Sequence, residues 1–176
     1  MNGLDEAHEE GFAQYVVSAR PALRRNAFVL VGDWSAADDL VQQTLIALYR
    51  CWERLERHDA LSGYTRTVMV RIYIDERRKL RWTREQLQGS LPEPEPEPGD
   101  VTRVGDRLVL LEALSTLSAR QRSLVYLRYW EDLSIDEVAQ IMGCSSATVR
   151  SSTSRAMRIL REYLNRLGAA AGADGT

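Results

Sequence analysis

The sequence contains little cysteine and histidine, with two of each in 176 residues. Cys51 and Cys144 are far apart in the chain, neither belongs to a C-x-x-C pair, and His8 and His58 are isolated. Metal sites with sulfur and nitrogen ligands need clusters of these residues, so we expect no metal site and no cofactor. Two free thiols in a reducing cytoplasm are expected in place of a disulfide.

Long apolar runs are also missing. No stretch approaches the length of a membrane span, and the acidic N-terminus is not followed by the apolar core of a signal peptide. The sequence has no glycine-rich phosphate loop and no pairing of a nucleophile with a base. These absences predict a cytoplasmic protein that is not an enzyme, with no membrane partner and no small-molecule substrate.

Strand patterns are nearly absent, and helical periodicity covers most of the chain. The exception is the acidic segment 83–105, in which proline and glutamate alternate from Pro92 to Pro98. Proline lacks an amide donor and holds its predecessor in an extended conformation, so we expect a polyproline-like linker. The predicted fold is all-α, with two small helical domains at 1–82 and 106–167 and a disordered tail at 168–176.

Domain 1–82 is expected to contain three or four helices. Apolar residues recur at helical spacing up to Leu30, and Gly32 then breaks the first helix. Ser35 is expected to cap a second helix, with Asp38 in the capping-box position. The apolar face of this second helix is predicted to comprise Leu40, Val41, Thr44, Leu45, Leu48 and Trp52.

Residues 64–82 contain six basic side chains and two acidic ones, although the net charge of the chain is only −2. Ser62 is expected to cap a helix over 63–81 whose core face holds Tyr64, Val68 and Ile72. A cationic stripe with one aromatic ring is predicted on the far side, formed by Arg66, Tyr73, Arg77 and Arg81. Such a stripe suits single-stranded nucleic acid, because arginines meet phosphates and a base stacks on the ring. The alternative is that this face is only solvated, with an exposed tyrosine among arginines.

Two other side chains of this helix allow more than one role. Arg71 lies four residues before Asp75, which places the two in range of an ion pair. Trp82 either covers the end of the core or joins the nucleic-acid surface, and the sequence does not decide between these.

Domain 106–167 carries two capping boxes, Ser-Ala-Arg-Gln at 118–121 and Ser-Ile-Asp-Glu at 134–137. Each predicts the start of a helix. Gly143 is expected to end the short second helix, and Ser145 or Ser146 to cap a longer one that follows. A short helix, a turn containing glycine and a longer basic helix form a helix-turn-helix pattern.

The longer helix has two chemically distinct faces. On a helical wheel, the arc predicted to face the core contains Val149, Thr153, Ala156, Leu160 and Leu167. The opposite arc contains Arg150, Ser151, Ser154, Arg155 and Arg158. Arginine reads guanine or binds phosphate, and short serines allow a helix to approach a groove closely, so this face favours DNA reading over simple solvation.

Several of these segments carry a family likeness. Residues 37–44, Ala-Asp-Asp-Leu-Val-Gln-Gln-Thr, resemble region 2.2 of extracytoplasmic-function sigma factors. Five further segments resemble region 4 of the same factors: 118–122, 127–134, 137–139, 142–145 and 148–151. The two regions occur in the family's order and are separated by a linker. The region 4 segments are most similar to the sigma-E-like actinobacterial branch of the family.

The resemblance implies that the chain binds core RNA polymerase, through its beta-prime and beta subunits, and promoter DNA. The residues it assigns to polymerase binding are Asp38, Asp39, Gln42, Gln43 and Trp52. Those it assigns to the minus-ten element are Arg66, Arg71, Tyr73, Arg77 and Arg81, with segment 53–63 helping to hold a flipped base. Those it assigns to the minus-thirty-five element are Ser146, Thr148, Arg150, Ser151, Ser154, Arg155 and Arg158.

The family likeness implies two further features. The acidic linker is expected to enter the RNA channel of polymerase, unless it is an inert connection. An anti-sigma factor is a further partner that the family implies and that no residue of the chain identifies. Thr153 departs from the family's usual leucine or isoleucine, Ser154 from a larger side chain, and Arg71 from asparagine. Because Arg71 and Ser154 lie near the expected DNA contacts, the promoter sequence is left open.

Two other functions compete with this one. A helix-turn-helix regulator that never engages polymerase would explain 134–160 but not 38–44. A sigma-like adapter that binds polymerase without melting DNA would leave the basic helix at 63–81 unused. Tight duplex binding without a complex with core polymerase would favour the regulator, and polymerase binding without transcription would favour the adapter.

Overall fold

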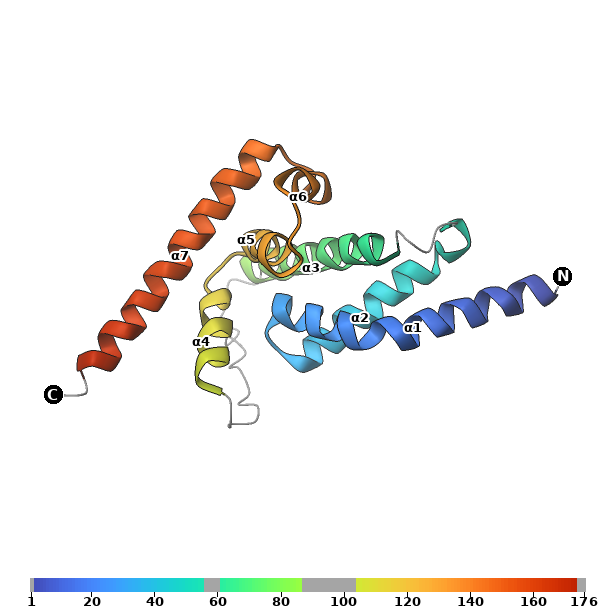
Figure 1. Ribbon diagram of the computed structural model, residues 1–176, viewed down its shortest axis with the longest axis horizontal. Coiled ribbons are helices and arrows are strands. Elements are labelled where there is room, and N and C mark those ends of the chain that lie inside the picture. Colours follow the sequence, from blue (N-terminus) through green and yellow to red (C-terminus); the bar gives the residue numbers. More distant parts are fainter. Residues whose placement is uncertain (1, 56–60, 87–103, 174–176) are drawn as a thin grey trace. The chain divides into compact units, whose positions relative to one another are not determined.

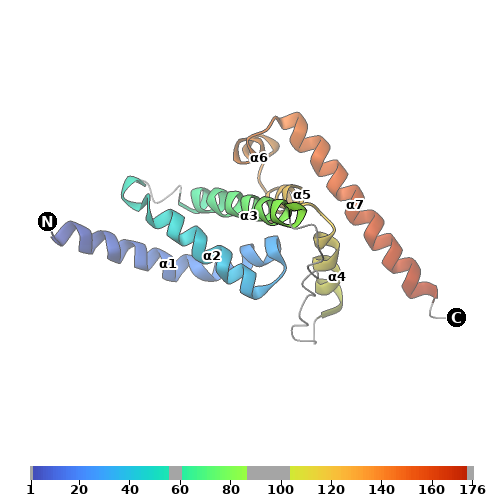
Figure 2. The ribbon, with the colours of Figure 1, turned by 180° about the vertical axis from the view of Figure 1, so that it is seen from behind.

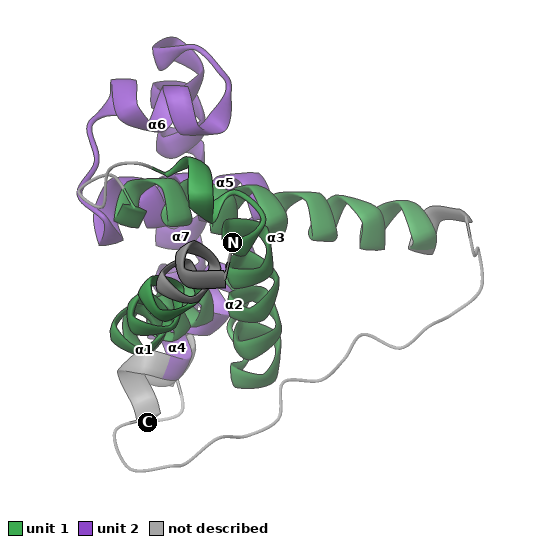
Figure 3. Ribbon diagram, turned by 90° about the vertical axis from the view of Figure 1, so that its right-hand side faces the viewer, with its two compact units in different colours: residues 1–86 green, residues 87–176 purple. Residues whose placement is uncertain are grey.

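The computed structural model describes residues 2–55, 61–86 and 104–173, and every regular element in these ranges is helical. The chain divides into two compact units, residues 1–86 and 87–176, shown in different colours in Figure 3. The all-α class expected from the periodicity is confirmed. Most of the predicted acidic linker lies outside the described residues.

Unit 1 consists of α1 (Asn2–Val31), α2 (Trp34–Tyr49), the short 3-10 helix η1 (Trp52–Arg54) and α3 (Leu61–Gln86), as Figure 1 shows. Helix α2 packs against both α1 and α3. The chain reverses between α1 and α2 at Gly32, whose φ of 84° is in the left-handed region that suits glycine. The interior of the unit is apolar and includes Leu23, Ala27, Leu30, Leu40, Leu48, Met69 and Val70, all buried.

The start of α2 differs from the capping box predicted at Ser35. The cap is Asp33, whose carboxylate accepts a hydrogen bond from the Ala36 amide at 2.7 Å. Asp38 therefore has no capping role. It pairs with Arg24 of α1, whose Nε and Nη2 donate to the two carboxylate oxygens at 2.7 and 3.0 Å. Arg24 gives this carboxylate two charge-assisted hydrogen bonds, whereas a capping box would give it one.

Trp52 lies beyond the end of α2 and is a core residue, 8% exposed. Its ring packs against Phe12 at 5.1 Å and Tyr15 at 5.4 Å between centroids, beside Leu48 and Leu61. The prediction that Trp52 belongs to the same face of one continuous helix as Leu48 was wrong, because α2 ends at Tyr49. As a polymerase contact Trp52 is also inaccessible in this structure.

The core face of α3 is rotated from the predicted one. Leu61, Thr65, Met69 and Tyr73 are buried, whereas Tyr64 is exposed. Thr65 can be buried because its hydroxyl forms hydrogen bonds with the Leu61 carbonyl and the Tyr15 hydroxyl, both at 2.7 Å. The helix continues through Gln86, five residues past its predicted end at 81.

Unit 2 consists of α4 (Val104–Ser115), α5 (Ala119–Val125), the single π-helical turn η3 (Tyr126–Trp130), α6 (Ile135–Met142) and α7 (Ser146–Ala173). Helices α4, α5 and α6 all pack against α7, which Figure 2 shows from behind. Helix α5 continues directly into the π turn η3, after which the Tyr126 hydroxyl donates a hydrogen bond to Glu131 at 2.6 Å. Helix α7 continues through Ala173, past the predicted end of the domain at 167.

Both predicted capping boxes of unit 2 are confirmed. Ser118 and Gln121 cap α5, and Ser134 and Glu137 cap α6, each by reciprocal side-chain to backbone hydrogen bonds. Gly143 ends α6 in the left-handed conformation, with φ of 59° and ψ of 45°, as expected for a helix C-terminus. Of the two candidates for the cap of α7, Ser145 is the one that accepts from the Thr148 amide, at 3.1 Å.

Candidate functional site

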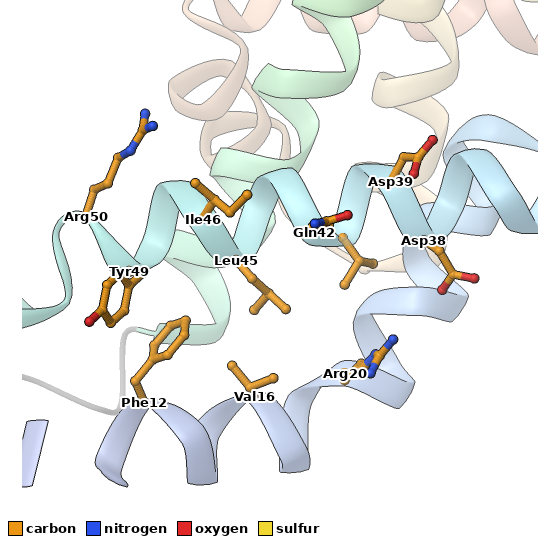
Figure 4. A pocket seen from close by; sticks show the side chains of 11 residues that line it. Phe12, Val16, Arg20, Asp38, Asp39, Gln42, Leu45, Ile46, Tyr49 and Arg50 are labelled. Atoms are coloured by element: carbon orange, nitrogen blue, oxygen red, sulfur yellow. The ribbon is translucent and has the colours of Figure 1, made fainter. Parts of the chain in front are cut away.

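A groove of about 730 Å³ lies between α1 and α2. Figure 4 shows Phe12 and Val16 on α1 facing Leu45 and Tyr49 on α2, with Asp39 at the other end of the groove. The full lining is Phe12, Val16, Arg20, Asp38, Asp39, Val41, Gln42, Leu45, Ile46, Tyr49 and Arg50. An apolar floor with charged ends suits a partner segment that has an apolar stripe and polar flanks.

Three of the five residues predicted to bind polymerase line this groove: Asp38, Asp39 and Gln42. The other two do not. Gln43 turns toward α3 and donates a hydrogen bond to Glu76, and Trp52 is in the core. Sequence reasoning missed the apolar part of the groove, in particular Ile46 and Tyr49, which are 46% and 51% exposed. On a helical wheel these two residues lie away from the arc of Leu40, Thr44 and Leu48. That offset was the sequence signal that could have placed them on the surface.

The two aspartates at the groove differ in their contacts within the chain. The Arg24 guanidinium holds the pKa of Asp38 below its ordinary value, chiefly through the hydrogen bonds it donates. Arg24 also lies over the Trp34 ring, 4.3 Å from its centroid, and this ring stacks on Phe28. Asp38 is therefore already satisfied within the chain, whereas Asp39 is exposed.

The basic residues of α3 occupy more than one face. Arg71, Arg77 and Arg81 are exposed, and Arg66 is half-buried. Tyr73 is 4% exposed, so the prediction that its ring is a stacking platform among these arginines was wrong. Its ring completes the core between α3 and its neighbours, and Arg77 lies over it at 5.8 Å. The acid that was placed to pair with Arg71, Asp75, forms an ion pair with Arg78 at 3.3 Å.

Helix α7 presents the two faces that the wheel predicted. Val149, Thr153, Ala156 and Leu160 are buried. The exposed residues on the opposite side are Thr148, Arg150, Ser151, Ser154, Arg155 and Arg158. Ser146 differs from this group, because it is half-buried and its hydroxyl donates to Asp136 of α6 at 2.6 Å. This bond fixes the first turn of α7 against the helix before it.

The geometry of α6, the Gly143 turn and α7 is that of a helix-turn-helix, with the arginine-bearing start of α7 free to enter a groove. The described residues contain no cluster of three or more potential metal ligands. None of the helices in the described ranges is both long and apolar enough to cross a membrane.

Comparison with known proteins identifies both units. Residues 16–83 match Sigma-70 region 2, and residues 107–160 match Sigma-70, region 4. The chain is 36% identical over 157 residues to the RNA polymerase sigma-E factor of Streptomyces coelicolor, covering 87% of this chain and 85% of that protein. It is 34% identical over 153 residues to the ECF RNA polymerase sigma factor SigL of Mycobacterium tuberculosis, covering 83% and 84%.

A solved structure shows the same architecture. The sigma factor RpoE of Bartonella quintana, in complex with the anti-sigma factor NepR, superimposes with a TM-score of 0.69 at 28% identity, covering 89% of this chain and 98% of that one. A region 2 unit followed by a region 4 helix-turn-helix defines a sigma factor of bacterial RNA polymerase. The chain belongs to the extracytoplasmic-function group of these factors, in its sigma-E-like branch. It binds core RNA polymerase and directs promoter-specific initiation of transcription.

Proposed function

We propose that unit 1 holds polymerase and opens the minus-ten element, while α7 of unit 2 reads the minus-thirty-five element. The observation that carries this division is the two-faced α7: four buried residues fix the helix, and the arginines and serines opposite them project into solvent. The domain bounds proposed for these roles are 1–82 and 106–167, joined by the acidic segment 83–105.

For polymerase binding, the groove between α1 and α2 supports a reduced set of the predicted residues. Asp39 and Gln42 are exposed at it and supply polar contacts, and Ile46 and Tyr49 supply apolar area. We assign Asp38 an indirect role, because its carboxylate is already bonded to Arg24. Gln43 acts by joining α2 to α3 through Glu76.

For the minus-ten element, the exposed arginines of α3 are the proposed contacts. Arg71, Arg77 and Arg81 bind phosphates, and this binding weakens as salt rises because counterions are released. Arg66 is half-buried and contributes at the edge of that surface. Most of segment 53–63, to which the family likeness gives the flipped base, lies outside the described residues.

For the minus-thirty-five element, Arg150 is the strongest candidate for base reading. It is exposed in the second turn of α7, one residue past the buried Val149 that anchors that turn. Ser151 and Ser154 share its side of the helix and permit close approach to the bases. Arg155 and Arg158 follow one and two turns later and are placed for phosphates.

Four further features of the proposal come from the family rather than from the geometry. We propose that the chain has no catalytic activity of its own and acts in the cytoplasm, where polymerase works. A partner that holds it inactive, of the anti-sigma kind seen with the Bartonella protein, would cover the groove or the face of α7. The acidic linker entering the RNA channel remains a prediction.

The test is run-off transcription with core polymerase over a library of genomic promoter fragments. The chain is expected to yield a defined set of transcripts whose upstream sequences share two elements. An α7 variant carrying Arg150→Ala and Ser154→Ala is the matched control, because it changes only exposed side chains. Polymerase binding without any transcript would instead identify an adapter that cannot open DNA.

A further inference from the structure

The C-terminal part of α3 projects beyond the core of unit 1, and Figure 3 shows it extending past α1 and α2. Tyr73 is the last buried side chain among those described on the helix. From Arg77 to Thr83, all seven consecutive side chains are exposed. Four of the seven are cationic and none is anionic, so this segment is a strongly basic surface that the fold of unit 1 does not need.

Trp82 lies within this basic segment and is 65% exposed. The sequence left two roles for it, covering the end of the core or joining a nucleic-acid surface, and its exposure removes the first. A single exposed apolar residue needs no explanation. Trp82 differs because tryptophan has the largest apolar surface of any side chain. Its neighbours between Arg77 and Thr83 are all polar or cationic except Leu80.

The arrangement along the helix gives Trp82 a place in a defined stripe. Arg71, Arg78 and Trp82 are spaced by seven and four residues, so they lie on one face of α3, opposite Tyr73. The first two are exposed cations, and Arg78 is paired at 3.3 Å with Asp75, an exposed acid that lies between them. A backbone of phosphates running along this stripe would meet Arg71 and then Arg78, and the next group it would reach is the indole ring.

We infer that Trp82 stacks on an unpaired base of the melted promoter, and that it extends the nucleic-acid surface of α3 beyond the residues assigned above. Single-stranded nucleic acid is recognised by cationic side chains that follow the backbone and aromatic rings that stack on bases. Duplex DNA offers no base face to a ring on a helix surface. This inference rests on the proposed role of α3 at the minus-ten element.

The experiment measures the affinity of the holoenzyme, assembled from core polymerase and the full chain, for each single strand of the minus-ten element. The promoter is one recovered in the run-off screen, and the strands carry a fluorescent label. Trp82→Ala is expected to weaken binding to at least one strand by about 5-fold to 150-fold, the range for loss of one stacked base. Trp82→Phe keeps a ring and should retain most of the affinity.

Leu80→Ala is the matched control, because Leu80 is 53% exposed in the same segment and has no aromatic ring. It should leave the affinity within about twofold, since no stacking is lost. Equal affinity of the Trp82→Ala and unchanged holoenzymes for both strands would overturn the inference. So would a loss of affinity for core polymerase with DNA binding intact, because that would make Trp82 a protein contact.

The failure of the inference is distinguishable from failure of the proposed function. If the unchanged chain makes specific transcripts, and the Trp82→Ala chain makes them equally well and binds both strands equally tightly, only the stacking role is lost. If the unchanged chain makes no transcript at all, the role of α3 at the minus-ten element is lost, and the stacking role with it.

Discussion

Replacing Trp52 with alanine is expected to unfold unit 1 partly or wholly, rather than to remove a polymerase contact. The indole is 8% exposed and packs on Phe12, Tyr15, Leu48 and Leu61. Truncation of a buried large aromatic costs about 3–5 kcal/mol of unfolding free energy. The whole stability of a domain is only about 5–15 kcal/mol. At roughly 4–8 °C per kcal/mol for a unit of this size, the melting temperature falls by more than about 12 °C.

The assay is thermal unfolding followed by far-ultraviolet circular dichroism, with the unfolding of unit 2 as an internal reference. Trp52→Phe separates the core role from a binding role, because phenylalanine keeps most of the packing. Its affinity for core polymerase, measured by fluorescence anisotropy, should match that of the unchanged chain. A Trp52→Phe variant with an unchanged melting temperature and a tenfold weaker polymerase complex would refute the core assignment.

Three other predictions follow from individual side chains. Arg150→Ala should cost about 1–3 kcal/mol of promoter binding and relax the preference at one base position, measured on a set of base-substituted promoters; unchanged preference would contradict the α7 assignment. Thr153 is buried and its hydroxyl has no hydrogen-bond partner among the described residues. Thr153→Val should therefore raise the stability measured by thermal unfolding by about 1 kcal/mol, and a lower melting temperature would contradict this prediction. Arg24 lowers the pKa of Asp38, so the stability that this pair contributes is present above the unfolded-state pKa and is lost as pH falls below about 4. Between pH 7 and pH 3 the urea midpoint of Asp38→Asn should therefore drop less than that of the unchanged chain. Equal drops would refute the coupling.

Local chemistry explains which parts of the fold were predictable from sequence. The caps at Ser118 and Ser134 and the turn at Gly143 depend on residues within four positions of one another, so their sequence patterns determine the structure. The two faces of α7 were also predictable, because its apolar residues keep one period and its other residues are short or charged. These features predict correctly which side chains of α7 are buried and which are exposed.

Unit 1 was harder to predict because long-range contacts decide it. Helix α3 has apolar or β-branched residues on several sides, so its periodicity does not select one core face, and the Tyr15–Thr65 hydrogen bond, fifty positions apart, is what favours the observed one. The cap of α2 is Asp33, and the carboxylate of Asp38 is paired with Arg24 of another helix. Neither partner can be identified from the local sequence.

Helix α7 keeps its anchoring side chains and the side chains proposed to read DNA on separate faces, and within the described residues no side-chain hydrogen bond links one set to the other. Mutations at Arg150 or Ser154 therefore leave the fold intact, and mutations at Val149 or Ala156 destabilise it without touching the bases. A duplicated copy of this chain can acquire a new set of promoters by drifting on one face alone. The same separation makes α7 a practical place to reprogram the factor in the laboratory.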